Sequence, residues 1–104
     1  MIKMMSNSAY VKAVAEELET KGAYAYFEAE DIFDIEYSID DQLNYRGVRI
    51  MIACGGPTVY IDSKTGSVDL FWGSEEAHYY LSPSCRDDIN GYFSERFQME
   101  SSFF

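Results

Sequence analysis

Three groups of residues carry side chains that can do chemistry. Asp34 and Glu36 stand two positions apart, so on a strand their carboxylates share one face at roughly 6.6 Å, a spacing that suits an inverting glycosidase pair or a metal clamp. His78 is the only histidine of the chain, and its side chain is suited to general-base work near neutral pH. Asp40 and Asp41 are adjacent oxygen ligands for a hard divalent cation.

None of these groups belongs to a motif that specifies an enzyme. The chain contains no GxSxG, P-loop, GxGxxG, HExxH or DxDxDG pattern. A general acid needs the raised pKa that burial provides, whereas Asp34 and Glu36 alternate with apolar residues and so fall on the solvent side of a strand. We therefore predict a non-enzymatic protein without a cofactor or metal. A small hydrolase or metal-dependent enzyme that uses His78 or the Asp34/Glu36 pair is the second alternative.

Negative charge is concentrated in one acidic segment, which runs from Glu28 to Asp41. It contains seven carboxylates and no lysine or arginine, in a chain with a formal net charge of −10. This charge disfavours direct binding to nucleic acids or to anionic membranes. The segment is either a solubilising surface or a surface that meets a basic partner. Its carboxylates belong to Glu28, Glu30, Asp31, Asp34, Glu36, Asp40 and Asp41.

Length and composition predict a single domain that spans residues 1–104. Hydrophobic residues make up 47% of the chain and aromatic residues 16%, which is enough for a packed core. There is no apolar run typical of a signal peptide and no stretch of transmembrane length, so we expect a cytoplasmic protein. Cys54 and Cys85 lack metal-binding spacing, and we expect both to be reduced, buried thiols.

Apolar periodicity predicts the elements that position these residues. Val11, Val14, Ala15 and Leu18 recur at helical spacing and indicate a helix from Asn7 to Lys21. The pattern then changes to strict alternation, which is the period of a strand with one wet face.

A strand is expected from about Phe33, within the acidic segment. Phe33, Ile35, Tyr37 and Ile39 alternate with polar residues, which predicts these four side chains in the core and the carboxylates between them on the wet face. A helix stays open as an alternative because Ile32, Ile35 and Ile39 also fit helical spacing. The β-branched and aromatic residues favour the strand.

Further alternation predicts the rest of an antiparallel sheet. A tight hairpin turn is expected at residues 63–66, with Gly66 in a left-handed conformation. A last helix is expected to begin at Ser82-Pro83, with Ser84 and Asp87 as its capping box. The other strands are expected at residues 48–53, 58–62, 68–72 and, at an edge, 77–81. The fold class is α+β, an antiparallel four- to five-stranded meander sheet flanked by an N-terminal and a C-terminal helix on one face.

The solvent-facing phase of this sheet also holds apolar residues. Met51, Tyr60 and Phe71 fall on it, although a face that meets only solvent tends to avoid such side chains. Arg49 falls on the same phase and can offset a carboxylate across the strands. Acidic residues beside aromatic ones are typical of an interaction surface.

Strand carboxylates on one face form a linear array of negative charge, as do the phosphates of duplex DNA. We therefore predict inhibition by DNA mimicry, in which the seven carboxylates of the acidic segment, with Tyr60 and Phe71, enter the basic groove of a host nucleic-acid-binding protein. The first alternative is a homodimeric accessory or structural domain that pairs through Met51, Tyr60 and Phe71.

One run of the sequence carries a resemblance. "VRIMIACGGPTVYIDSKTGSVDLFWG" (Val48 to Gly73), followed by a short strand and a helix containing "INGYF", resembles a group of small uncharacterised proteins carried by phages and mobile elements of Firmicutes. The GGP, the hairpin and the tryptophan after it are its most specific part. The resemblance implies no catalytic residues. It implies a phage accessory protein in the host cytoplasm, a class that includes inhibitors of host defence such as anti-CRISPR proteins, several of which are acidic DNA mimics.

Overall fold

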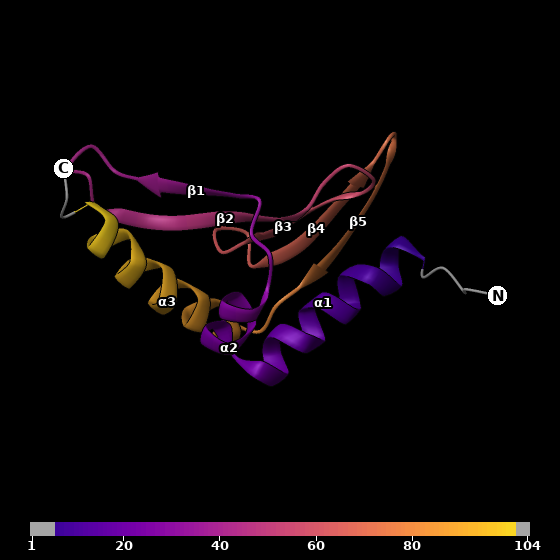
Figure 1. Ribbon diagram of the computed structural model, residues 1–104, viewed down its shortest axis with the longest axis horizontal. Helices are drawn as coiled ribbons and strands as arrows, with labels where there is room; N and C mark the ends of the chain where they lie inside the picture. The colour runs from indigo at the N-terminus through magenta and orange to yellow at the C-terminus, as the bar shows by residue number, and fades with distance from the viewer. Residues whose placement is uncertain (1–5, 102–104) are drawn as a thin grey trace.

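Each strand of the sheet pairs with its neighbour in the chain. In a computed structural model that describes residues 6–101, five strands form one antiparallel sheet in the order β1-β2-β3-β4-β5. Figure 1 shows this sheet as the upper layer, with the helices below it. The elements are α1 (Asn7–Lys21), α2 (Ala23–Ala29), β1 (Asp34–Ile39), β2 (Tyr45–Ala53), β3 (Thr58–Asp62), β4 (Ser67–Trp72), β5 (Glu75–Tyr80) and α3 (Pro83–Ser101).

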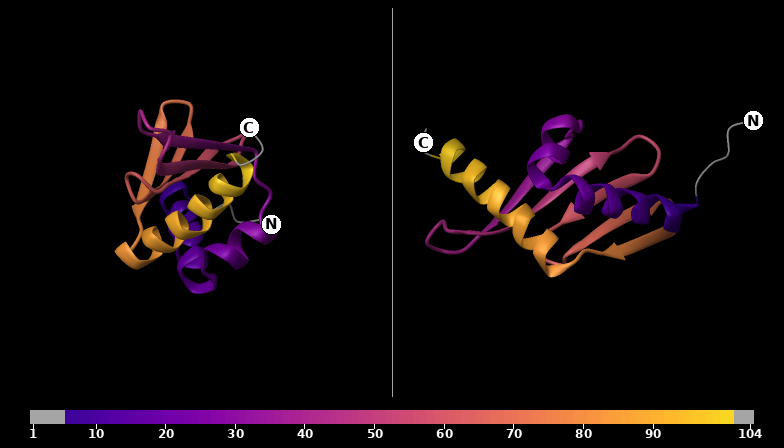
Figure 2. Two further views of the ribbon diagram at one scale, coloured as in Figure 1. Left: turned by 90° about the vertical axis from the view of Figure 1, so that its left-hand side faces the viewer. Right: turned by 90° about the horizontal axis from the view of Figure 1, so that it is seen from below.

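All three helices lie on the same side of the sheet. α1 contacts β4 and β5, α3 contacts β2, and α2 contacts both other helices (Figure 2). The predicted α+β class and the placing of the N-terminal and C-terminal helices on one face are therefore confirmed, and the meander has five strands. No helix in the described part of the chain is long and apolar enough to span a membrane.

The core fills the space between the sheet and the helices. The ring of Phe93 in α3 is fully buried and meets the ring of Phe27 in α2 edge-on, with 4.9 Å between the centroids. Fully burying one large apolar side chain is worth about 1.5–3 kcal/mol, so this layer supplies most of the stabilising energy. Its most completely buried apolar side chains are those of Val11, Leu18, Val48, Ile50, Val59, Ile61, Val68, Leu70, Ile89 and Phe93.

Helix α2 has no counterpart among the predicted elements. It is only seven residues long, too short for an apolar period to stand out. Gly22 separates it from α1 with a φ of +83°, a conformation that glycine adopts without strain. The first amide of α2, Ala23 N–H, donates to Asp88 Oδ2 in α3 at 2.7 Å. Asp88 thereby supplies the cap that Gly22 lacks, and α3 holds the start of α2 in place.

The start of α3 differs from the prediction in its cap. Ser82 Oγ accepts a hydrogen bond from the Cys85 amide at 3.2 Å, so the predicted capping box of Ser84 and Asp87 is wrong. The reason is Pro83, which occupies the first position of the helix and leaves the capping position to the residue before it.

The hairpin turn between β3 and β4 is confirmed, and Gly66 has a φ of +68°. Arg86 of α3 binds the backbone of this turn. Its Nε donates to the Ser63 carbonyl at 2.5 Å, and its Nη2 donates to the Lys64 carbonyl. The helix is thus tied to the sheet by charge-assisted hydrogen bonds as well as by apolar contact.

Two of the four side chains predicted in the core from β1 are exposed. Phe33 is 57% exposed and Ile39 is 46% exposed, whereas Ile35 and Tyr37 do pack against the core. Phe33 precedes the first ladder pair, and a register shift between Ser38 and Ile39 interrupts the alternation. The strand itself is confirmed, and the helical alternative for this stretch is wrong.

The two cysteines also differ from one another. Cys85 is buried as predicted, and desolvation raises the pKa of its thiol to about 11, so it stays protonated and weakly nucleophilic. Cys54 is exposed, contrary to the prediction, because it lies after the end of β2, just before the bend at residues 55–57.

Candidate interaction surface on the open face of the sheet

The outward-pointing residues of the five strands form a face that no described helix covers, and we call it the open face. Register places its residues in rows that run across the strands. The central row crosses all five strands and consists of Asp34, Met51, Tyr60, Asp69 and His78. A row to one side consists of Glu36, Arg49, Asp62, Ser67 and Tyr80. A short row to the other side consists of Thr58, Phe71 and Glu76.

Four of these side chains stack into a ladder from β2 to β5. The guanidinium carbon of Arg49 lies 3.6 Å from the centroid of the Tyr60 ring. Tyr60 meets Phe71 edge-on at 6.2 Å between centroids, and Phe71 meets His78 edge-on at 5.9 Å. Each contact joins neighbouring strands. The rings of Tyr60 and Phe71 are half-buried, and the Arg49 guanidinium covers the face of Tyr60.

Carboxylates surround this ladder. Five of them lie on the open face, and the only basic side chains there among the described residues are Arg49 and His78. Asp69 is only 13% exposed and binds Ser67 and His78, and Asp62 accepts a hydrogen bond from the Lys64 amide of the β3–β4 turn. Aromatic rings and carboxylates both attract cations, so the face suits the arginine and lysine side chains of a partner. The five carboxylates are those of Asp34, Glu36, Asp62, Asp69 and Glu76.

His78 is held between two of these acids. Its Nδ1 lies 2.7 Å from Asp69 Oδ1, and its Nε2 lies 3.2 Å from Glu76 Oε1. These hydrogen bonds, that of Asp69 foremost, raise the pKa of His78 above its ordinary value. The imidazolium form therefore persists closer to neutral pH than in an isolated histidine.

The geometry around His78 does not assemble a nucleophile with its base. Ser67 Oγ donates to Asp69 Oδ1 at 2.9 Å, so both the hydroxyl and the imidazole bind the same carboxylate. In a serine hydrolase the imidazole stands between the hydroxyl and the acid. The open face therefore offers recognition chemistry at this point and no activated hydroxyl.

The acidic segment is divided among four places, namely the open face, the helical layer, the connection from α2 to β1 and the β1–β2 turn, rather than presented as one strip. Asp34 and Glu36 lie on the open face beside the ladder. Glu28 lies in the helical layer, where its Oε2 accepts a hydrogen bond from the Tyr92 hydroxyl at 2.5 Å. Glu30 ends α2, and Asp31 is exposed in the connection to β1.

The pKa of the Glu30 carboxyl is raised. Partial burial is the main cause, and the neighbouring carboxylates of Glu17 and Asp31 add to it. Its charge is thus partly suppressed compared with that of a fully solvated carboxylate.

Asp40 serves the turn between β1 and β2. Its Oδ1 accepts hydrogen bonds from the amides of Gln42 and Asn44, both at 2.9 Å, and its Oδ2 lies 3.2 Å from Arg46. The amide of Asn44 is the main cause of its lowered pKa. Asp41 is exposed beside it. Within residues 6–101 there is no group of three or more His, Cys, Asp or Glu side chains that could hold a metal ion.

Three acidic residues of this surface were not among the predicted contact residues. Asp62, Asp69 and Glu76 lie outside the acidic segment. Register places Asp69 opposite Tyr60 and Glu76 opposite Phe71, and Asp62 follows Tyr60 on the same side of β3. The alternation of the strands could have predicted two of them on the open face, because Asp62 is two positions from Tyr60 and Asp69 is two positions from Phe71.

In comparisons with known proteins, no family model, curated protein or solved structure matches this chain.

Proposed function

We propose that this protein is a non-enzymatic acidic binding protein, encoded by a phage or mobile element, that inhibits a host nucleic-acid-binding defence complex in the cytoplasm by mimicking DNA. The open face carries the proposal: five carboxylates surround an aromatic ladder on a sheet face that no described helix covers. A groove that binds phosphates by arginine and lysine side chains would accept this arrangement in place of a duplex.

Spacing along the strand supports mimicry. Asp34 and Glu36 point the same way two residues apart, which is roughly 6.6 Å and close to two base-pair steps of duplex DNA. Tyr60 and Phe71 give the same surface a neutral aromatic centre, which suits the buried anchor of a protein interface. The acids outside the open face would add long-range attraction toward a basic partner.

Capture from a Firmicute lysate by the tagged full chain tests this proposal. We expect capture of a nucleic-acid-binding protein at low salt, and its release by high salt and by added duplex DNA. Asp34→Lys with Glu36→Lys should abolish capture. Asp40 is left unchanged because its carboxylate holds the β1–β2 turn.

The matched control is Glu16→Lys with Asp87→Lys, which makes the same change in net charge at exposed positions of α1 and α3. This pair should retain capture. Equal loss in both pairs would mean that net charge alone attracts the partner. Capture that survives the Asp34 and Glu36 reversal, or that duplex DNA does not displace, would rule out mimicry through the open face.

The contact between Tyr60 and Phe71 also favours a second candidate, a homodimeric accessory domain that pairs through the open face. Sedimentation of the pure protein separates the two. A dimer that dissociates on Tyr60→Glu or Phe71→Glu would favour pairing between copies, whereas a monomer at all accessible concentrations would exclude it.

A further inference from the structure

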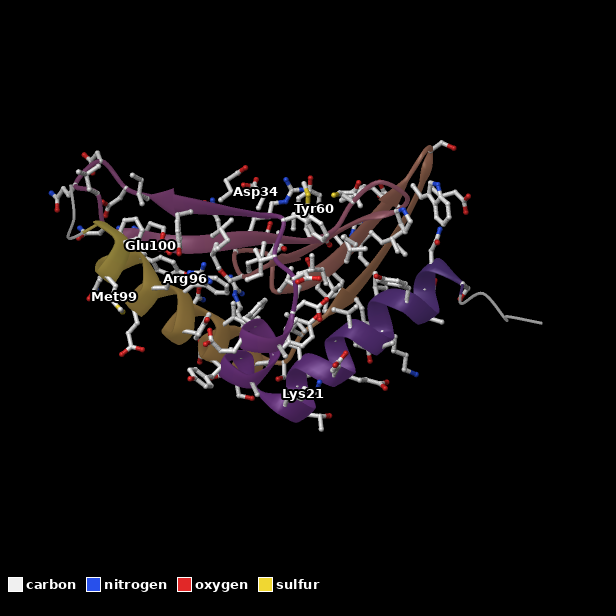
Figure 3. The ribbon with its side chains drawn as sticks, in the orientation of Figure 1. Lys21, Asp34, Tyr60, Arg96, Met99 and Glu100 are labelled. Atoms are coloured by element: carbon white, nitrogen blue, oxygen red, sulfur yellow. The ribbon has the colours of Figure 1, made fainter. Side chains whose placement is uncertain are left out.

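A second acidic and aromatic surface lies in the helical layer. Between α2 and α3 is an open hollow of about 500 Å³, which we call the α2–α3 groove. In Figure 3, Arg96 and Met99 lie below the sheet on α3, whereas Asp34 and Tyr60 lie above the sheet. The groove and the open face are thus on different sides of the molecule. The groove is lined by Tyr24, Glu28, Tyr92, Glu95, Met99 and Glu100, together with Arg96.

Aromatic rings form one wall of the groove and are held in place by the core. Tyr92 stacks on Phe27 with 5.9 Å between centroids and an angle of 16°, and it meets Phe93 edge-on at 4.9 Å. Tyr24 meets Tyr92 edge-on at 6.1 Å and is 70% exposed. The wall is therefore preorganised at Tyr92 and accessible at Tyr24, which lowers the entropic cost of binding.

The charge of the groove is negative. Three carboxylates line it, and Arg96 Nε pairs with one of them, Glu100 Oε1, at 2.9 Å. Glu28 accepts the hydrogen bond from Tyr92 Oη and pairs with no described cation. Glu95 is exposed and has no hydrogen bond or ion pair with any described residue. Two carboxylates are thus left without a cationic partner in the groove.

Arg96 shows which chemistry this surface accepts. Its guanidinium carbon lies 5.9 Å from the centroid of the Phe93 ring, and its Nε binds a carboxylate. Tyr24, Tyr92 and Glu28 repeat this combination of aromatic ring and acid a short distance along the same groove. A volume of about 500 Å³ is that of a site for a ligand larger than a single ion.

We propose that the α2–α3 groove binds an arginine or lysine side chain presented by a protein segment, with the cation between the Tyr24 ring and the carboxylates of Glu28 and Glu95. The ring supplies cation–π attraction, and the aliphatic stem of the bound side chain lies along the aromatic wall. The site is separate from the open face, so both surfaces can be occupied at once.

Methionine methyl groups give a matched pair of reporters. Met99 lines the groove, and Met51 lies in the central row of the open face. The full chain labelled with ¹³C at methionine methyls is titrated with the blocked tripeptides Gly-Arg-Gly and Gly-Lys-Gly. The control is the same peptide with citrulline, which has nearly the shape of arginine without its charge. We expect a saturable shift of the Met99 signal with the two cationic peptides and none with citrulline.

Three variants complete the test. Tyr24→Ala and Glu28→Gln should each weaken the Met99 response several-fold, and Glu28→Gln leaves an acceptor for the Tyr92 hydroxyl. Tyr24→Phe should retain the response, because the ring is kept. An unshifted Met99, an equal response to citrulline, or a full response in Tyr24→Ala would overturn the proposal.

The two proposals fail separately. Asp34→Lys with Glu36→Lys changes the open face, so the Met99 response should remain in that variant; its loss there would overturn the groove as an independent site. Lysate capture that survives the same variant contradicts only the proposed function.

Discussion

The guanidinium of Arg49 covers the ring of Tyr60, with 3.6 Å between the guanidinium carbon and the ring centroid. Arg49 also lies directly opposite Glu36 in the pairing of β2 with β1. The open face thus already holds one cation, Arg49, on the Tyr60 ring, which is the ring that a partner's cation would contact. Replacing Arg49 should therefore change partner binding and folding stability in opposite directions.

Removal of that internal cation is expected to strengthen partner capture. Arg49→Gln makes the open face more negative and uncovers Tyr60, so capture should tighten several-fold and depend more steeply on salt. The free energy of unfolding should fall by no more than about 1 kcal/mol, the range of an exposed cation–π contact. Lys12→Gln, which removes one charge from α1, is the control. Lost capture in Arg49→Gln would mean that Arg49 itself contacts the partner.

His78 makes stability depend on pH. Its pKa is raised in the folded protein, so the contribution of the imidazolium is fully present below its unfolded pKa and is lost as the pH rises through the folded pKa. His78→Gln should therefore lower the free energy of unfolding at pH 6, and the difference should fade by pH 9. We expect less than about 1 kcal/mol, because the pair is partly exposed and screened. Urea denaturation at both pH values measures it, and a loss that is the same at both would refute the linkage.

Asp88 is expected to stabilise α2 from outside that helix. Asp88→Ala removes the acceptor for the Ala23 amide and should cost about 1 kcal/mol, the usual effect of losing a helix cap. Asp87→Ala, one position earlier and exposed, should have little effect. Thermal unfolding compares the two variants. Equal stability of both would show that the Ala23 amide finds another acceptor.

Leu43 is expected to be a strained position. It has a φ of +63° in the β1–β2 turn, which costs a residue with a Cβ atom roughly 1–2 kcal/mol. Leu43→Gly relieves that strain and loses part of the gain to the greater entropy of the unfolded chain, so a net gain of up to about 1 kcal/mol is expected. Leu43→Ala keeps the strain and should show no gain. Chemical denaturation of the two variants checks this, and a less stable glycine variant would contradict it.

Much of the fold could be predicted from local patterns. The spacing of Val11, Ala15 and Leu18 specifies the buried stripe of α1, and alternation specifies which strand residues face the helices. Short connections between strands leave little choice but a meander. The same alternation placed Tyr60 and Phe71 on the outward phase, where register confirms them.

Other features could not be predicted because they depend on partners distant in the chain. α2 is too short to show a period, and its first amide is capped by Asp88, 65 residues away. Phe33 and Ile39 continue the alternation of β1. However, the pairing of β1 with β2 begins only after Phe33, and its register shifts just before Ile39.

The sequence by itself determined that this protein is acidic, that it has a sheet with one wet face, and that aromatic side chains lie on that face. Only the tertiary structure decided which acids share a surface. It sends Glu28 to the helical groove beside Tyr92 and keeps Asp34 on the open face. It also brings Asp69 next to Tyr60, and His78 next to Asp69 and Phe71. The physical reason is the sequence range of the interactions. Periodicity depends on neighbouring residues and predicts only which side of its own helix or strand a residue lies on. A surface is formed by register and packing between elements that are far apart in the chain.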